Sequence, residues 1–202
     1  MTEKLFWQDA YLSEFDAKVL ETRGKEVILD KTAFYARSSG QPGDTGEING
    51  IKVVDTYYDA NGNIVHLLER EPDFKVNDIV HGKIDWERRH KIMRLHTAAH
   101  IISAVLVKAF GNIKFTGSQI YEDRARMDFN LEKLDDEVVR FIEEKANEIV
   151  EKDLPVFSKI ISKEELENHP ELARACSTWY RKYMFRVVQQ SSLLCKQRDL
   201  SI

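Results

Sequence analysis

The first half of the chain has the short alternation of apolar and polar positions that is typical of β-strands. One pair of apolar runs is separated by Gly24-Lys25, and a second pair by a turn containing Asn61-Gly62, a dipeptide that readily adopts positive φ angles. The expected strands are residues 17–23, 26–30, 52–58, 64–69 and 79–84. Short strands at this spacing predict a small β-barrel or sandwich.

The period of the apolar positions changes after residue 85. Between Trp86 and Phe110, apolar side chains recur every three or four residues, which predicts an amphipathic helix. These side chains are Ile92, Leu95, Ala99, Ile102, Leu106 and Ala109. We therefore place a domain boundary near Asp85, with a β-barrel domain over residues 1–85 and a second domain over residues 86–202.

The second domain mixes helical and strand patterns. A helix is expected from about Asp135, which can serve as its N-cap, to Lys152, with apolar side chains on one stripe. A strand is expected over residues 156–161, and residues 162–165 form a capping-box pattern that opens a short helix before Pro170. The predicted fold class is therefore α+β.

The charge of the chain is unevenly distributed. Of the 202 residues 32% are charged, and the net charge is −4, which argues against a globally basic nucleic-acid-binding protein. Nine basic and four acidic residues nevertheless lie between Lys83 and Arg126, a local net charge of +5, whereas Asp and Glu dominate residues 132–171. A polyanionic partner is expected near the positive segment.

Cysteine content and hydropathy indicate a cytoplasmic protein. Only Cys176 and Cys195 are present, and the first residues lack a long apolar segment. No apolar run approaches the roughly 18 residues that a membrane span needs, so no membrane association is expected. Nothing in the sequence indicates an obligatory protein partner.

Within the positive segment, the sequence His96-Thr-Ala-Ala-His100 carries the most specific candidate chemistry. Residues four apart project from one face of a helix, so two imidazoles at this spacing can bind one metal ion or one substrate group. The same spacing also occurs in ordinary polar or half-buried pairs. Thr97 stands where a zinc metalloprotease has its catalytic Glu, which excludes that class of enzyme.

Two histidines are half of a zinc site, because zinc takes about four N, S or O ligands. Cys195 and Asp199 form a Cys-x-x-x-Asp near the C-terminus, and Cys176 is a competing thiol. Either cysteine can alternatively be a small buried hydrophobe. The metal expected at a completed site is Zn²⁺.

Two further segments are rich in small polar residues. Residues 34–46 contain three glycines and a proline, and such a loop can bring backbone N–H groups close to a ligand or simply connect strands of the barrel. Residues 115–129 place Thr116, Ser118 and Gln119 at an expected turn, followed by a strand-like run with Arg124 and Arg126 on one face. That segment can bind a small amino acid, or it can be a solvent-exposed loop and strand.

Together these motifs resemble the editing domain of alanyl-tRNA synthetase, and most closely its free-standing relatives, the AlaX family. Phe34-Tyr35 and residues 40–46 (Gly-Gln-Pro-Gly-Asp-Thr-Gly) match the Gly-rich loop of the family, with Ser39 in place of its first glycine. The histidine pair matches the family's His-x-x-x-His helix. The resemblance covers about residues 4–172, and the layout is similar to medium-sized members that carry the N-terminal Gly-rich domain.

The resemblance implies an N-terminal β-barrel, a C-terminal α+β editing domain of the type common to threonyl- and alanyl-tRNA synthetases, and hydrolysis of mischarged tRNA(Ala). The implied substrates are Ser-tRNA(Ala) and Gly-tRNA(Ala). Cys195 aligns with the family's zinc-binding cysteine, but Asp199 stands where the family has its last histidine, and the composition from about residue 173 is atypical. The implied metal ligands are His96, His100, Cys195 and Asp199.

An editing site must accept serine or glycine and reject alanine, which favours small polar groups around the substrate. Our candidates for these groups are Thr32, Gln41 and Gln119. Our candidates for phosphate contacts with the tRNA acceptor stem are Arg88, Arg89, Lys91 and Arg94, which can equally be a solvated helix face. The group that activates water is left open between a zinc-bound water and the 2′-hydroxyl of the substrate.

Two functions of other classes remain as alternatives. The chain can be a non-catalytic tRNA-binding protein with an incomplete metal site, which its metal content would reveal. It can also be a metal-dependent esterase that does not require tRNA, which its activity on small aminoacyl esters would reveal.

Overall fold

The structure is a computed structural model that describes residues 2–111, 113–162, 168 and 185–190. The chain divides into two compact units, each described by itself below. The first unit comprises Met1–Thr97 and Gly117–Met127, and the second comprises Ala98–Thr116 and Asp128–Ile202. The domain boundary expected near residue 85 stays a prediction.

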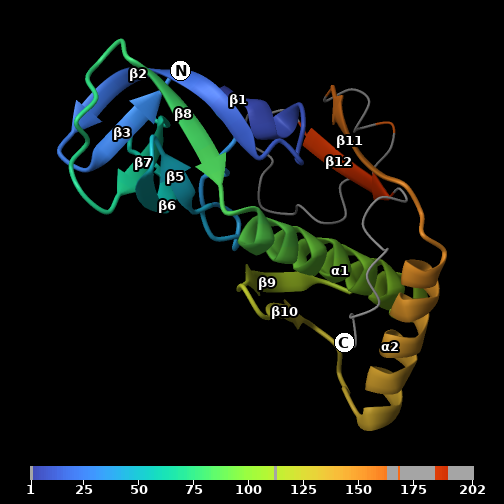
Figure 1. Ribbon diagram of the computed structural model, residues 1–202. Helices are drawn as coiled ribbons and strands as arrows, with labels where there is room; N and C mark the ends of the chain where they lie inside the picture. The colour runs from blue at the N-terminus through green and yellow to red at the C-terminus, as the bar shows by residue number, and fades with distance from the viewer. Residues whose placement is uncertain (1, 112, 163–167, 169–184, 191–202) are drawn as a thin grey trace. The chain divides into compact units, whose positions relative to one another are not determined.

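A closed antiparallel barrel forms most of the first unit (Figure 1). The strand order is β2-β3-β7-β6-β5-β8, and β8 pairs with β2 to close the sheet. The bounds are β2 Glu14–Arg23, β3 Glu26–Leu29, β5 Gly46–Ile48, β6 Ile51–Tyr58, β7 Ile64–Leu68 and β8 Ile79–Ile84. Closure leaves no unpaired sheet edge. The predicted barrel is confirmed, and so are all five predicted strands.

The barrel interior follows from the alternation of side chains along the strands. On β2, Phe15, Ala17 and Val19 are buried, whereas Glu14 and Asp16 are exposed. The same alternation on the other strands assembles one apolar cluster. Burial of one large aliphatic side chain stabilises the fold by roughly 1.5–3 kcal/mol. Because the barrel buries many of them, it is the main folding core of this unit.

Short elements outside the barrel were not predicted. The strands β1 (Glu3–Lys4) and β4 (Lys31–Thr32) pair in parallel, and a 3-10 helix covers Leu5–Trp7. Elements of two or three residues are too short for a hydrophobic period to emerge. The 3-10 helix contributes Phe6 to a small cluster with Ala36 and Ile64.

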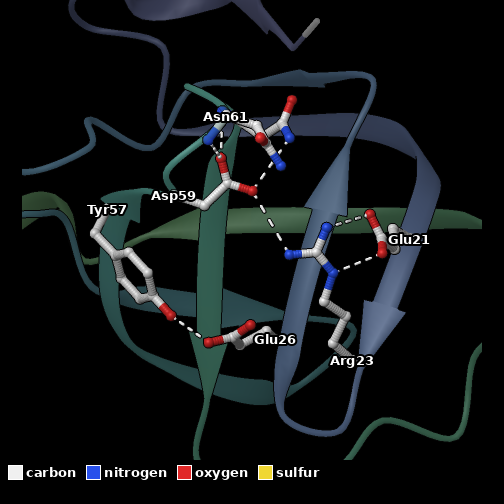
Figure 2. A network of polar contacts seen from close by, with 7 residues as sticks. Glu21, Arg23, Glu26, Tyr57, Asp59 and Asn61 are labelled. Carbon is white, nitrogen blue, oxygen red and sulfur yellow. Dashed lines mark hydrogen bonds and ion pairs between the residues drawn. The ribbon is translucent and has the colours of Figure 1, made fainter.

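A polar network fastens the β6–β7 turn to the β2–β3 hairpin (Figure 2). The Asp59 carboxylate accepts the backbone N–H of Asn61 at 2.9 Å and lies 3.6 Å from the Arg23 guanidinium. Arg23 also donates to both Glu21 oxygens, at 2.6 and 2.7 Å. Arg23 and Glu21 are partly exposed, so their ion pair adds little stability, and the network mainly orients the turn around the less exposed Asp59.

Beside it, the Tyr57 hydroxyl donates to the Glu26 carboxylate at 2.5 Å, also drawn in Figure 2. This bond joins β6 to β3 across the intervening β7. Because the hydrogen bond to Glu26 holds the phenolic proton, it raises the pKa of Tyr57 to about 12. Tyr57 therefore stays neutral at physiological pH.

Helix α1 (Trp86–Phe110) has the bounds expected from the apolar period, and its residues divide between the two units. In the second unit, α2 (Asp136–Glu151) begins at the predicted N-cap, where the Asp135 carboxylate accepts the N–H of Val138 at 3.0 Å. Ile101, Val105 and Leu106 of α1 form a hydrophobic core with Ile142 and Ala146 of α2. The predicted mixture of helices and strands is confirmed.

The strand β11 (Val156–Ile161) is also confirmed, and it pairs antiparallel with β12 (Phe185–Gln190). The helix expected from the capping-box pattern at residues 162–165 lies outside the described residues. The strand β12 was not predicted.

Residues 115–129 form a hairpin of β9 (Phe115–Ile120) and β10 (Ala125–Phe129). The turn predicted around Thr116 and Gln119 is wrong, because these residues belong to β9. The turn lies between the strands, where the Tyr121 N–H donates to the Arg124 carbonyl at 2.8 Å. Gly117 and Ser118 suggested a turn, but the alternation of half-buried and exposed side chains along β9 is that of a strand.

By length and composition alone, α1 is long and apolar enough to cross a membrane, so the expectation that no segment approaches this criterion is wrong. One such helix is weak evidence for a span, because the core helix of a soluble protein meets the same criterion. Ile92 and Leu106 of α1 are fully buried against other parts of the protein.

Candidate active site

His96 and His100 occupy successive turns of α1, so their side chains project from the same side of the helix. His96 is half-buried, and His100 keeps solvent access. Desolvation by the surrounding protein lowers the pKa of His100. A neutral imidazole is the form that can bind a metal ion.

The side chain of Gln41 selects one tautomer of a neutral His96. The Nδ1 of His96 lies 2.6 Å from Oε1 of Gln41, and an amide oxygen can only accept a hydrogen bond. The proton of neutral His96 therefore sits on Nδ1, which leaves the ring lone pair on Nε2. A carbonyl oxygen that holds the Nδ1 proton is the usual outer partner of a histidine that binds zinc through Nε2.

A tight turn presents Gln41 to the helix. The backbone N–H and C=O groups of Ser38 and Gln41 bond reciprocally, at 3.1 and 2.9 Å. Ser39 and Gly40 between them have φ angles of +50° and +79°, the combination that defines a type I′ turn. Asn-Gly, Asp-Gly and Gly-Gly are the usual pairs in this turn, and serine at the first position costs about 1 kcal/mol of backbone strain. The turn nevertheless forms, with both backbone hydrogen bonds between Ser38 and Gln41 in place.

Strand β9 holds this turn in place. The Ile120 N–H donates to the Gly40 carbonyl at 2.7 Å. A Cβ atom on Gly40 would lie 2.2 Å from the carbonyl oxygen of Ser118, so only glycine allows this approach. The predicted substrate-binding residue Gln119 lies on the same strand, half-buried, with its amide nitrogen donating to the Ile120 carbonyl at 3.3 Å. The loop, β9 and His96 thus meet within the first unit.

A buried ion pair anchors the far end of the Gly-rich loop. Arg89 and Asp44 have side chains only 4% and 1% exposed, and the guanidinium Nη1 donates to Oδ2 of Asp44. The same oxygen accepts the Tyr35 N–H at 2.6 Å. Desolvation raises the pKa of Asp44 in spite of the opposing charge of Arg89. The structure therefore gives Arg89 a role in holding the loop, and a side chain this buried does not present itself to a phosphate.

The neighbouring basic side chains are also engaged. Arg88 donates to the Gly43 carbonyl at 2.8 Å and pairs with Glu122, so it joins the loop to the β9–β10 turn. Lys91 pairs with Glu87 one helical turn away, at 2.7 Å. Phosphate binding by Arg88, Lys91 and Arg94 stays a prediction.

Thr32, predicted to bind substrate, is completely buried in the barrel with His66. The His66 Nδ1–H donates to the Val27 carbonyl at 3.1 Å, and its Nε2 accepts the Thr32 hydroxyl proton at 2.8 Å. The Thr32 oxygen in turn accepts the Phe34 N–H at 3.1 Å. Burial lowers the pKa of His66 to about 4, so its imidazole is neutral. The sequence offered His66 only as a further zinc-ligand candidate without favourable spacing, and its contact with Thr32 was not readable because it depends on the pairing of β7 with β3.

The described residues contain no group of three or more His, Cys, Asp or Glu side chains placed to hold a metal ion. Cys195 and Asp199, the other predicted ligands, lie outside the described residues, as does Cys176. The donor chemistry fits zinc, since imidazole nitrogen is one of its preferred ligands.

Residues 6–88 match the family model of class II (A) tRNA synthetases, which places the barrel and the start of α1 in an aminoacyl-tRNA context. The alanyl-tRNA editing protein AlaX-M of Saccharolobus solfataricus is 38% identical over 179 residues, 86% of this chain and 75% of that protein. AlaX-M of Pyrococcus horikoshii is 40% identical over 154 residues, 73% of this chain and 71% of that protein. The chain belongs to the AlaX-M family of alanyl-tRNA editing proteins.

The alanine–tRNA ligase of Methanococcus maripaludis is 43% identical over 168 residues, which are 82% of this chain and 19% of that enzyme. The chain is thus similar to one segment of a much longer synthetase and to most of a free-standing protein. The resemblance found in the sequence motifs is confirmed.

Proposed function

We propose that the protein is a trans-editing hydrolase that deacylates mischarged tRNA(Ala), with Ser-tRNA(Ala) and Gly-tRNA(Ala) as substrates. Membership of the AlaX-M family supports the reaction class, because the relatives are named alanyl-tRNA editing proteins. The observation that carries the assignment to this site is the hydrogen bond from His96 to Gln41. It joins the two motifs, helix and Gly-rich loop, that are far apart in the sequence.

His96 and His100 would hold zinc, together with Cys195 and Asp199. When bound, zinc supplies Lewis-acid chemistry for the hydrolysis of an ester. Gln41 keeps the proton of His96 on Nδ1, and burial of Gln41 and half-burial of His96 keep competing water away from that hydrogen bond. Zinc affinity should therefore depend on Gln41 as well as on the ligands themselves.

Discrimination between serine and alanine requires a polar group that bonds the serine hydroxyl and is left unpaired by alanine. Gln41, which is bonded to His96, and Gln119, on the strand that contacts the Gln41 turn, would supply such groups. Thr32 would act less directly, through the conformation of the Phe34 backbone at the start of the loop, to which its hydroxyl oxygen is bonded.

The test is a deacylation assay with purified protein and three substrates: Ser-tRNA(Ala), Ala-tRNA(Ala) and a small seryl ester without tRNA. We expect hydrolysis of the first and little of the other two. Equal rates on the small ester would instead identify a tRNA-independent esterase. Binding of tRNA(Ala) without any hydrolysis by zinc-loaded protein would identify a non-catalytic binding protein.

A further inference from the structure

Three rings lie against one another at the start of α1, and they are called the stack below. The indole of Trp86 and the imidazole of His90 are nearly parallel, 5.5 Å apart with an angle of 17° between their planes. The phenol of Tyr11 also lies against Trp86, 5.4 Å away and tilted by 47°. All three residues belong to the first unit.

The stack does not serve a hydrophobic core. None of its three residues belongs to the apolar clusters formed by the described residues. Tyr11 is 41% exposed, and Trp86 and His90 are only half-buried. Aromatic faces left at the surface in series are a common platform on which nucleobases stack.

Arg94 continues the same face of α1, one turn beyond His90. Burial of His90 and the positive charge of Arg94 both lower the pKa of the His90 imidazole, which agrees with their proximity. Among the residues that the structure describes, Arg94 has a buried Nε–H with no hydrogen-bond partner. Arg94 as a whole is only half-buried, in contrast to the buried Arg89, so its cationic side chain keeps some access to solvent and to an anionic ligand.

The charge around the stack is compatible with an anionic ligand. Of the nearby carboxylates, Glu87 is paired with the cation of Lys91, and Asp9 accepts the Tyr11 backbone N–H at 2.8 Å but keeps its negative charge. A guanidinium at the end of a ring series combines the two requirements of single-stranded nucleic acid, base stacking and phosphate contact.

We propose that the outward faces of the ring group of Tyr11, Trp86 and His90 stack bases of a single-stranded RNA and that Arg94 contacts its phosphate. The RNA is the unpaired 3′ end of the aminoacyl-tRNA, so this assignment rests on the proposed function. At 1.5 Å per residue, His90 and Trp86 lie about 9 and 15 Å along the helix from His96, a span of a few nucleotides.

The experiment measures affinity for a fluorescently labelled single-stranded RNA ending in CCA by fluorescence anisotropy, separately from activity. Tyr11→Leu keeps an apolar side chain but removes the aromatic face, and it should weaken binding at least about fivefold. Tyr121→Leu is the matched control, since Tyr121 is 39% exposed in the same unit and lies beside Arg124. It should leave the affinity unchanged.

The phosphate contact is tested by salt dependence. Arg94→Gln should reduce the slope of log Kd against log salt by about 0.7, the value for one phosphate of a single strand. Wild type and Tyr11→Leu should bind an abasic oligonucleotide of the same length with equal affinity, because it carries phosphates but no bases that could stack.

The outcomes separate this assignment from the proposed function. If Tyr11→Leu and Arg94→Gln both bind the RNA as the wild type does, the stack is not an RNA surface, whether or not the protein deacylates tRNA. If both variants bind more weakly but the wild type hydrolyses no aminoacyl-tRNA, the surface is upheld and the proposed function is overturned. In an active enzyme, Tyr11→Leu should raise KM and leave kcat unchanged, because it acts on binding remote from the ester.

Discussion

Replacement of Arg89 by methionine tests whether the buried ion pair holds the Gly-rich loop. The variant keeps the apolar stem of the side chain and removes its charge, which leaves the Asp44 carboxylate buried and uncompensated. Asp44 is 1% exposed, and its Oδ1 already has no hydrogen-bond partner among the described residues. Removing one partner of a buried pair costs about 3–5 kcal/mol of folding free energy.

Urea denaturation at pH 7 measures this loss. The loss should shrink as the pH is lowered to 5, because desolvation raises the pKa of Asp44 and protonation removes the uncompensated charge. Deacylation should fall as well, since the same loop presents Gln41 to His96.

The matched control is Lys91→Met, which breaks an ion pair on the same helix between side chains that are 57% and 82% exposed. It should leave the unfolding free energy unchanged, because exposed pairs contribute little. A double variant, Arg89→Met with Asp44→Asn, should recover part of the loss. If Arg89→Met unfolds at the same urea concentration as Lys91→Met, the anchoring role of the pair is refuted.

Two further predictions concern the barrel and the turn. Burial lowers the pKa of His66 from 6.5 to about 4, so the imidazole stays neutral in the folded barrel but takes up a proton in the unfolded chain. The free energy of unfolding should therefore fall by about 2 kcal/mol between pH 7 and pH 5. His66→Gln should remove that share of the pH dependence in urea titrations, and an unchanged dependence would contradict it. Gly40→Ala should lower the melting temperature more than Gly62→Ala: both have φ near +80°, but only Gly40 has a backbone atom, the Ser118 oxygen, in the way. Equal shifts would show that the turn does not rest on β9.

Much of the fold was predictable because its signals are local. The barrel strands show alternation of period two, and the turn at Asn61-Gly62 has the expected chemistry. The helix over Trp86–Phe110 shows a sustained period of three to four, and the α2 N-cap at Asp135 follows from side-chain hydrogen bonding. Sheet closure was not readable, since the pairing of β8 with β2 joins residues far apart in the chain.

The candidate site was only partly predictable for the same reason. The sequence identified Gln41 and His96 separately, but their hydrogen bond depends on how the turn and α1 pack. The basic cluster was read as a phosphate surface, whereas Arg89 compensates a buried carboxylate that a linear pattern cannot reveal. Gln119 was expected in a turn, but it lies in β9, because that segment pairs with β10 and the turn falls after Ile120.

The most direct test of the account measures zinc content and Ser-tRNA(Ala) deacylation on the same protein, before and after removal of the metal by a chelator. We predict close to one zinc ion per chain, hydrolysis that is lost with the metal and restored by added zinc, and reduced zinc affinity in both His96→Ala and Gln41→Leu. Full hydrolysis by the metal-free protein, or zinc affinity that is unchanged in His96→Ala, would contradict the account.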